Sequence, residues 1–500
     1  MSTHLPTVDV VWFKRDLRIT DHAPLNHAQQ SGRPLILLYT FEPSVMAASD
    51  FGSNHLGFIN DSLTHLNHAL NAHKAQLLIC HAEVIQVFEE LVQHVHIATL
   101  RSHREVGNII TYKRDKAVKR WCQQHQIEWH EYSCLEVQRP HPNRDHWAKN
   151  WEKEMKKPVK NLSKTPLNCL PLPHLKLQLH TPLQHQDIHK APPAPSRQPN
   201  QRGNPIGLLD SFLTDRCHNY RKAMASPLLA PRACSRMSPH LSYGTVSIRE
   251  VVQHTRDFYQ QHALNGTHLK AIESFVSRLH WRGHFMQKLE DQVDIEWRCL
   301  DPRTENLRPA GQHEARLDAW KTGHTGVPMV DACMRFLNHH GWINFRMRAM
   351  LVSFACYNLW LDWREIHPHL AQAFTDYEPG IHLSQLQMQA GTTGINTLRI
   401  YNPIKQSQEL DPNGLFIRKW VPEIASRNHT NIHLPANQIK QSSLFDEPEN
   451  YPRPVVDLQD SAHHAREIMF GIRKTPHQAI ARVIKMHASR KKWPSQRRQT

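Results

Sequence analysis

The first 140 residues alternate between short apolar runs and longer stretches with helical spacing. The apolar runs are Val8–Trp12, Pro34–Thr40, Gln76–Cys80 and His96–Leu100. The stretches between them with helical character are Asp21–Asn26, Asn60–His73 and Val84–Gln93. Strands that alternate with helices of this length predict a parallel sheet with helical crossovers, which places residues 1–140 in the α/β class.

From Pro140 onward the character of the chain changes. Asn143–Lys160 is charged and carries tryptophans, and Lys164–Asn204 is rich in Pro, Leu, His and Gln with few periodic features. Residues 141–206 are therefore predicted to connect two domains. After Pro205, apolar positions recur every three to four residues in Gly207–Ala225, Ser247–His262, Leu269–Glu290, Glu314–Thr322, Val327–His339 and Arg346–Trp363. This spacing predicts an all-helical domain over residues 207–486, followed by a basic tail, His487–Thr500.

The charge balance favours an anionic partner. The 500-residue chain carries 61 Lys and Arg against 45 Asp and Glu, a formal net charge of +16. Nucleic acid is the simplest such partner, and basic tails are the alternative explanation. With 39% hydrophobic residues the chain can build large cores, which excludes wholesale disorder.

Membrane and secretory classes are disfavoured. The longest apolar stretch, Met350–Leu361, is broken by Ser353 and Asn358 and is too short to span a bilayer. The chain does not open with a charged segment followed by an apolar one, so no secretory signal is evident. We expect a cytoplasmic protein, nucleoid-associated if bacterial. We also expect it to be a monomer. The nine cysteines form no CxxC pair, so neither a disulfide framework nor a metal centre is expected.

The common phosphate loops are absent, and a serine-rich turn is the candidate in their place. The chain has no P-loop and no GxGxxG sequence. Cys234–Pro239 (CSRMSP) places Ser238 as the cap of a helix with Pro239 at its first position. Its free N–H groups, its serine hydroxyls and Arg236 could grip a diphosphate; a capped helix with no ligand is the alternative.

Two arginines and four tryptophans are the remaining candidates. Arg282 lies in a long helical stretch, and Arg348 has Asp376 and Glu378 as prospective partners, although such a pair can be purely structural. Aromatic residues at helical spacing usually belong to a core, but they can also stack on bases or relay electrons. The four tryptophans are Trp281, Trp342, Trp360 and Trp363.

In their order along the chain, these segments resemble the photolyase/cryptochrome family. The opening Val10–His22 (VVWFKRDLRITDH) is similar to the family's first strand and turn, and Ser235–Leu241 (SRMSPHL) to its flavin-phosphate sequence. Further matching segments are Trp320–Arg335, Gly341–Trp342, Arg346–Arg348, Asp362–Arg364, Tyr401–Gln406 and Asp411–Glu423. The resemblance implies a Rossmann-like parallel-sheet domain followed by a helical FAD-binding domain.

The resemblance also implies a flavin site. Tyr220, Ser235, Arg236, Met237 and Ser238 would contact the phosphate and ribose of FAD. Among the residues expected around the flavin ring, Arg348 would pair with Asp376, and His382 would face N5, where the family commonly has Asn. Arg282 and Glu378 are also expected around the flavin ring. A second, antenna chromophore is a further expectation, with His103–Glu105 and Asn108 in a suitable place.

For activity, the resemblance implies light-dependent splitting of pyrimidine dimers in ultraviolet-damaged DNA, by electron transfer from reduced FAD. The residues expected in catalysis are Trp281, Asn344, His382 and Trp363. The residues expected to face DNA are Arg278, Trp281, Trp342, Arg346 and Lys405. A blue-light receptor of the cryptochrome type and an inactive flavoprotein are the alternatives, and the short tail favours repair.

The chain departs from the family pattern at several places. Arg278 stands where repair enzymes usually have Glu, and Asn344-Phe345 replaces a frequent His-Asn. In the tryptophan relay, Leu386 and Met388 take the flavin-proximal places, and the surface tryptophan is replaced near Ala310. Only Trp363 keeps its relay place, so slow photoreduction of the flavin is expected unless Trp342, Trp360 or a tyrosine supplies another path.

Overall fold

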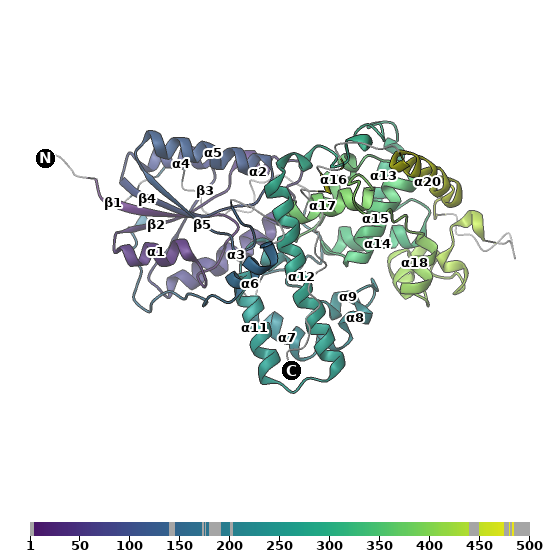
Figure 1. Ribbon diagram of the computed structural model, residues 1–500, viewed down its shortest axis with the longest axis horizontal. Helices are drawn as coiled ribbons and strands as arrows, with labels where there is room; N and C mark the ends of the chain where they lie inside the picture. The colour runs from purple at the N-terminus through teal and green to yellow at the C-terminus, as the bar shows by residue number, and fades with distance from the viewer. Residues whose placement is uncertain are drawn as a thin grey trace.

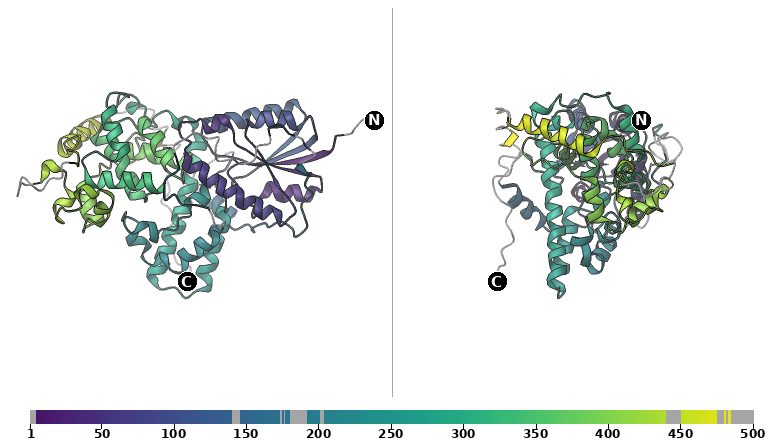
Figure 2. Two further views of the ribbon diagram at one scale, coloured as in Figure 1. Left: turned by 180° about the vertical axis from the view of Figure 1, so that it is seen from behind. Right: turned by 90° about the vertical axis from the view of Figure 1, so that its right-hand side faces the viewer.

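The structure is a computed structural model, which describes residues 5–139, 146–172, 175, 177–179, 192–200, 204–439, 450–474, 480 and 483–484. The predicted basic tail, His487–Thr500, lies outside these residues. Figure 1 shows a part built around a sheet at one end and a helical part at the other, with helix α12 (Gly266–Asp291) running between them. Seen from behind, the same division holds (Figure 2).

The sheet has five parallel strands in the order β3-β2-β1-β4-β5. They are β1 (Thr7–Phe13), β2 (Leu35–Thr40), β3 (Leu77–Cys80), β4 (His96–His103) and β5 (Glu128–Tyr132). In the central register Val10 faces Ile36 on one side and Leu100 on the other. The predicted parallel sheet is confirmed, and the sequence missed only β5, whose sequence EWHEY is polar as expected of an edge strand.

Helices cover both faces of the sheet. Helices α1 (Ala23–Ser31) and α3 (Ser53–Asn71) pack against the face that carries Val11 and Phe13. Helices α4 (Val84–Leu91) and α5 (Ile109–Gln124) pack against the opposite face (Figure 1). The central strands β1 and β2 therefore bury both rows of side chains, which explains their nearly continuous apolar runs in the sequence. The short helix α2 (Pro43–Met46) follows β2.

The segment predicted as a connection, residues 141–206, contains a helix that the sequence reading did not anticipate. Helix α6 (Trp147–Met155) buries Trp147, Trp151 and Met155. These apolar side chains recur every four residues, which is the helical signal. The ring of Trp151 lies 3.9 Å from that of His280 on α12, so this part of the connection packs against the helical part.

The described residues from 204 onward contain helices and no strand. The first of them are α7 (Pro205–Thr214), η3 (Arg216–Asn219), α8 (Tyr220–Ala223), α9 (Ala230–Ala233), α10 (Ser238–Ser242), α11 (Ile248–Gln261) and α12. The later ones are α13 (Glu314–Thr322), α14 (Pro328–His340), α15 (Phe345–Ser353), α16 (Trp363–Ala373), α17 (Pro379–Ala390), α18 (Pro403–Leu410), α19 (Leu415–Trp420) and α20 (Leu458–Lys474). The predicted all-helical second part is confirmed.

Two stretches predicted as single helices are interrupted, and these predictions were wrong. Gly207–Ala225 breaks at Asp215, whose φ of −125° leaves the helical range. Arg346–Trp363 ends as an α-helix at Ser353, continues as one π-helical turn, and resumes at Trp363. Trp360 has a φ of +59°, which no right-handed helix accommodates. Asp362 then caps the new helix by accepting the Arg364 amide.

In the part of the chain that the structure describes, no helix is both long and apolar enough to cross a membrane.

Candidate functional site

The candidate site is built where three helices of the second part meet. Helix α17 packs along α12, and α15 packs against α17. The approach is close because Gly380, at the start of α17, has no side chain: a Cβ there would lie 2.7 Å from the Cα of Met286. The loop before α17 carries Asp376 and Glu378, so both carboxylates are fixed between α12 and α15.

Arg348 and Asp376 form the ion pair expected from the sequence. Nη2 of Arg348 donates to both carboxylate oxygens of Asp376 at 3.0 Å, and its Nε donates to the Ile343 carbonyl at 2.7 Å. Burial by itself would raise the pKa of Asp376, but Arg348, the Ser238 hydroxyl and Arg236 together lower it. Asp376 is therefore an ionised carboxylate that holds a guanidinium in place.

Glu378 belongs to a second, buried network that joins the two parts of the chain. It accepts from Arg282 at 2.7 Å and from Arg15, at the end of β1, at 3.3 Å. Arg282 also pairs with Glu136 at 2.9 Å, between its Nε and the carboxylate Oε1. Arg282 thus lies between two carboxylates and can act as a fixed cation on α12.

Arg236 is a half-buried cation that forms no ion pair with a carboxylate among the described residues. Its Nε donates to Oε1 of Gln198 at 2.9 Å, and its backbone is left-handed, with a φ of +63°. Burial lowers its pKa to about 10, because desolvation disfavours the charged form. An anionic group beside Arg236 would compensate this charge.

The neighbours of Arg236 differ in part from the expectation. Ser238 is the first residue of α10 rather than its cap, and no side chain caps this five-residue helix. Met237 is buried, and the Ser235 hydroxyl accepts the Met237 amide at 3.4 Å. Tyr220 is buried against Arg278, and burial raises the pKa of its hydroxyl to about 12.

Polar atoms without a protein partner mark the interior of the site. His382 lies on α17 with its ring 5.0 Å from that of His367, and both are held neutral because burial lowers their pKa values. Asn344 donates its amide to the carbonyls of Met224 and Ala225. Within the described residues, Oδ1 of Asn344, Nε2 of His382 and Oγ of Ser384 are buried without a partner. Buried polar atoms of this kind call for a ligand or water.

A mixed aromatic and cationic surface lies beside these helices. Trp281 is 43% exposed and stacks on Phe285 with ring centroids 5.7 Å apart. Arg278 is exposed one turn before it on α12. Arg346 and Lys405 are also exposed. Trp342, in contrast, is only 6% exposed, because Arg236 lies over its ring.

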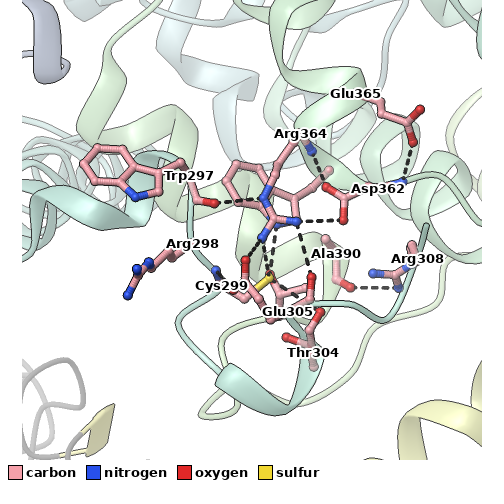
Figure 3. A network of polar contacts seen from close by, with 12 residues as sticks. Trp297, Arg298, Cys299, Thr304, Glu305, Arg308, Asp362, Arg364, Glu365 and Ala390 are labelled. Carbon is pink, nitrogen blue, oxygen red and sulfur yellow. Dashed lines mark hydrogen bonds and ion pairs between the residues drawn. The ribbon is translucent and has the colours of Figure 1, made fainter. Parts of the chain in front are cut away.

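The residues that the resemblance assigns to the relay differ in exposure. Leu386 is buried on α17, Met388 is half-buried on the same helix and Ala310 is exposed. Trp363 is fully buried and donates its indole N–H to the Cys299 sulfur at 3.4 Å. Figure 3 shows the polar network around Cys299, in which Arg364 lies between Asp362 and Glu305.

A separate cavity lies between the sheet and the helical part. Glu105 and Asn108 line it together with Tyr39, Arg114 and Tyr377. His103 points elsewhere, because its Nδ1 bonds to Asp16 at 2.7 Å. Two of the residues expected near an antenna chromophore thus line this cavity, and that assignment stays a prediction.

Sequence reasoning missed three residues that hold the site together: Arg15, Glu136 and Gln198. Each comes from outside the helical part and reaches the site over more than 35 residues of chain. No periodicity within a short window could have revealed these contacts.

Comparisons with known proteins agree with this geometry. Residues 9–140 match the family model described as DNA photolyase, and residues 275–470 match that described as the FAD binding domain of DNA photolyase. The chain is 30% identical to the deoxyribodipyrimidine photo-lyase of Streptomyces griseus over 469 residues, covering 91% of this chain and 97% of that protein. It is 28% identical to cryptochrome DASH of Synechocystis over 501 residues, covering 93% and 98%.

Solved structures show the same fold. A Synechocystis cryptochrome matches with a TM-score of 0.77 and 24% identity, covering 93% of this chain and all of that one. A bacterial class III photolyase from Agrobacterium tumefaciens matches with a TM-score of 0.76 and 22% identity, covering 95% and 99%. Sequence, geometry and these likenesses agree that the chain belongs to the DNA photolyase and cryptochrome family, with that family's FAD-binding domain.

Proposed function

We propose that this protein is a light-dependent DNA repair enzyme that splits pyrimidine dimers in ultraviolet-damaged DNA. The observation that carries the proposal is the position of Trp281. Its exposed ring lies one residue before Arg282, which is buried in the candidate flavin site. One helix therefore presents an aromatic face to solvent directly beside the cofactor, as a flipped lesion would require.

The residues of the site fit FAD. Arg236 supplies a half-buried cation without a direct carboxylate partner for the diphosphate, with Tyr220, Ser235, Met237 and Ser238 around it. Arg282, Arg348, Asp376, Glu378 and His382 would surround the ring system, and the orphaned atoms of Asn344 and His382 would meet its polar edge. When bound, reduced FAD supplies a light-excited electron to the dimer.

The protein's own groups then bind, orient and exclude water. Arg348 remains protonated at any physiological pH, so it provides a fixed positive charge beside an electron-rich ring. Asp376 holds that guanidinium in position through two bonds. His382 and His367 are neutral, so they add no second charge and can hold or accept a proton at a ring nitrogen.

DNA would be met by the exposed residues. Arg278, Arg346 and Lys405 are placed to contact phosphates, and Trp281 to stack on the displaced bases. We assign Trp342 to the support of Arg236 rather than to direct base contact, since its ring is covered. Trp363, together with Trp281, Asn344 and His382, remains in the proposed catalytic set.

The cavity lined by Glu105 and Asn108 is the proposed place for an antenna chromophore. Its walls are aromatic and charged, and it lies between the two proposed domains, 1–140 and 207–486, which residues 141–206 connect. One solved relative, a photolyase from Sulfolobus tokodaii, is described with two FAD molecules, with the implication of a novel light-harvesting cofactor.

A blue-light receptor is the second candidate. The likeness to cryptochrome DASH and the presence of Arg278, where repair enzymes usually have Glu, favour it. The two functions are separated by illuminating the purified flavoprotein with oligonucleotides that contain a cyclobutane thymine dimer, in single and double strands. Light-dependent loss of the dimer supports repair, whereas bound flavin without repair on either substrate supports the receptor.

A further inference from the structure

A cysteine and two histidines meet in the lobe formed by α7, η3 and the start of α12. They are Cys217, His218 and His268. The Cys217 sulfur and one nitrogen of each imidazole lie within 4.8 Å of one another. The imidazole rings of His218 and His268 are 4.3 Å apart at their centroids.

Both imidazoles are oriented by backbone carbonyls. Nδ1 of His218 donates to the Asp215 carbonyl at 2.8 Å, and Nε2 of His268 donates to the Leu213 carbonyl at 2.7 Å. A nitrogen that donates carries the proton, so a lone pair is left on Nε2 of His218 and on Nδ1 of His268. Histidines that bind metals typically give their other N–H to a carbonyl in this way.

From this cluster we propose that Cys217, His218 and His268 bind a soft divalent cation of the Zn²⁺ class. A thiolate with two imidazoles is a ligand set that suits Zn²⁺, and three protein ligands leave one position for water. His218 is exposed, so an ion and a water molecule can reach the cluster from solvent. On binding, the Cys217 thiol loses its proton to solvent, and its sulfur leaves the Leu213 carbonyl 3.5 Å away.

A second cluster, formed by Asp16, His22 and His103, does not leave imidazole lone pairs for a metal ion. Nε2 of His22 and Nδ1 of His103 both bond to the single oxygen Oδ2 of Asp16, at 2.9 and 2.7 Å. Nδ1 of His22 accepts the Leu25 amide. Both nitrogens that face the carboxylate therefore carry protons, and this cluster is closed by its own hydrogen bonds. The contrast singles out the first cluster as the one with free lone pairs.

The proposed ion would join two elements that are distant in sequence. Cys217 and His218 lie on η3, whereas His268 lies in the first turn of α12. A shared ion would fix the start of α12, the helix that carries Arg278, Trp281 and Arg282. The cation would thus stabilise the position of the helix that borders the proposed flavin site. This proposal does not depend on whether the protein repairs DNA.

The test measures bound zinc in the purified full-length flavoprotein. The protein is stripped with EDTA, equilibrated with Zn²⁺ buffered by a weak chelator, desalted, and assayed by mass spectrometry of the metal. Wild type should hold one tightly bound Zn²⁺ per chain, and X-ray absorption should show one sulfur at about 2.3 Å and nitrogen or oxygen at about 2.0–2.1 Å. Cys217→Ser should lose that ion.

Matched variants separate this site from adventitious zinc binding by a histidine-rich chain. His262→Ala removes a histidine of the same lobe that also bonds a carbonyl, that of Phe258, and it should keep the ion. His218→Gln alters an exposed side chain, so it should fold normally yet bind Zn²⁺ at least about tenfold more weakly. Equal zinc content in wild type, Cys217→Ser and His218→Gln would overturn the proposal, as would an absorption spectrum without sulfur.

Discussion

The guanidinium of Arg236 lies 3.9 Å above the ring of Trp342. Gln198 completes the arrangement: its Oε1 accepts Nε of Arg236, and its amide donates to the Arg236 carbonyl at 3.0 Å. A half-buried cation is thus held between an aromatic face and a neutral amide, and no carboxylate among the described residues forms an ion pair with it.

Gln198→Ala should weaken FAD binding, because Arg236 would lose the bond that orients it. One such bond is worth about 1 kcal/mol, so a fall in affinity of about fivefold is expected. Gln198→Glu should weaken binding further, since a carboxylate beside Arg236 competes with the diphosphate. The measurement is quenching of flavin fluorescence on titration. Gln253→Ala, which removes a glutamine on α11 whose amide also donates to a backbone carbonyl, that of Met155, serves as the control and should leave the affinity unchanged.

Arg348→Leu should cost the protein most of its flavin. The substitution removes the fixed cation beside the ring system and leaves Asp376 as a buried charge without its main partner, at a cost of about 3 kcal/mol. Arg346→Leu, two residues away and exposed, is the matched control. Flavin content per chain after gel filtration decides the matter: full occupancy in Arg348→Leu would show that the ion pair does not serve the cofactor.

The exposed face of α12 should carry much of the DNA affinity. Trp281→Ala removes a stacking platform and should cost about 1–3 kcal/mol of binding to dimer-containing DNA. Arg278→Ala should reduce the slope of the logarithm of the binding constant against the logarithm of the salt concentration by about one, as expected for one lost phosphate contact. Trp297 is also 43% exposed but does not lie on α12, so Trp297→Ala controls for the loss of any surface tryptophan. Equal losses in both tryptophan variants would place the DNA elsewhere.

Acid should destabilise the junction between the two parts of the chain through His55. Its Nδ1 accepts the Gly52 amide, and its Nε2 donates to the Ala371 and Phe374 carbonyls. Burial lowers the pKa of His55 to about 4 from an ordinary value of 6.5. The unfolded chain therefore binds a proton that the folded chain does not, so stability is full above pH 6.5 and falls as the pH drops towards 4.

This contribution can be measured by urea unfolding at a series of pH values. His55→Gln should be less stable at pH 7 but should show a shallower loss between pH 6.5 and 4. His68→Gln, an exposed change on the same helix, should follow the wild-type curve. An unchanged slope in His55→Gln would assign the acid sensitivity to other buried histidines.

The extent to which the sequence predicts the molecule depends on how local each feature is. Four strands and the long helix α12 could be predicted from the sequence, because burial on one or both faces requires apolar side chains at regular positions along consecutive residues. Strand β5 was missed because an edge strand keeps polar side chains. The break at Trp360 was missed because a single left-handed residue leaves the apolar spacing intact.

The residues of the candidate site also differ in whether the sequence predicts their contacts. The sequence predicts the pair of Arg348 and Asp376, because an arginine in a segment that resembles the family has a carboxylate as prospective partner, and the structure places their polar atoms 3.0 Å apart. Gln198 and Glu136 were not anticipated, since each meets its arginine through the tertiary fold alone. The packing of Arg236 over Trp342 could not be read from the sequence either, and it changes the role proposed for that tryptophan.

The relay offers a gain-of-function prediction. Leu386 is 2% exposed on α17, in the place where the family resemblance predicts the flavin-proximal tryptophan, and Trp363 is fully buried. An aliphatic side chain cannot carry an electron hole, so blue light with an external thiol should bleach the wild-type flavin slowly. Leu386→Trp should speed the bleaching by about tenfold or more, as an added relay step lowers the barrier to electron transfer. Leu386→Phe adds bulk without an oxidisable indole and should stay slow. Rapid bleaching of the wild type, abolished in Trp360→Phe but not in Trp363→Phe, would instead show that the electron takes a path through Trp360.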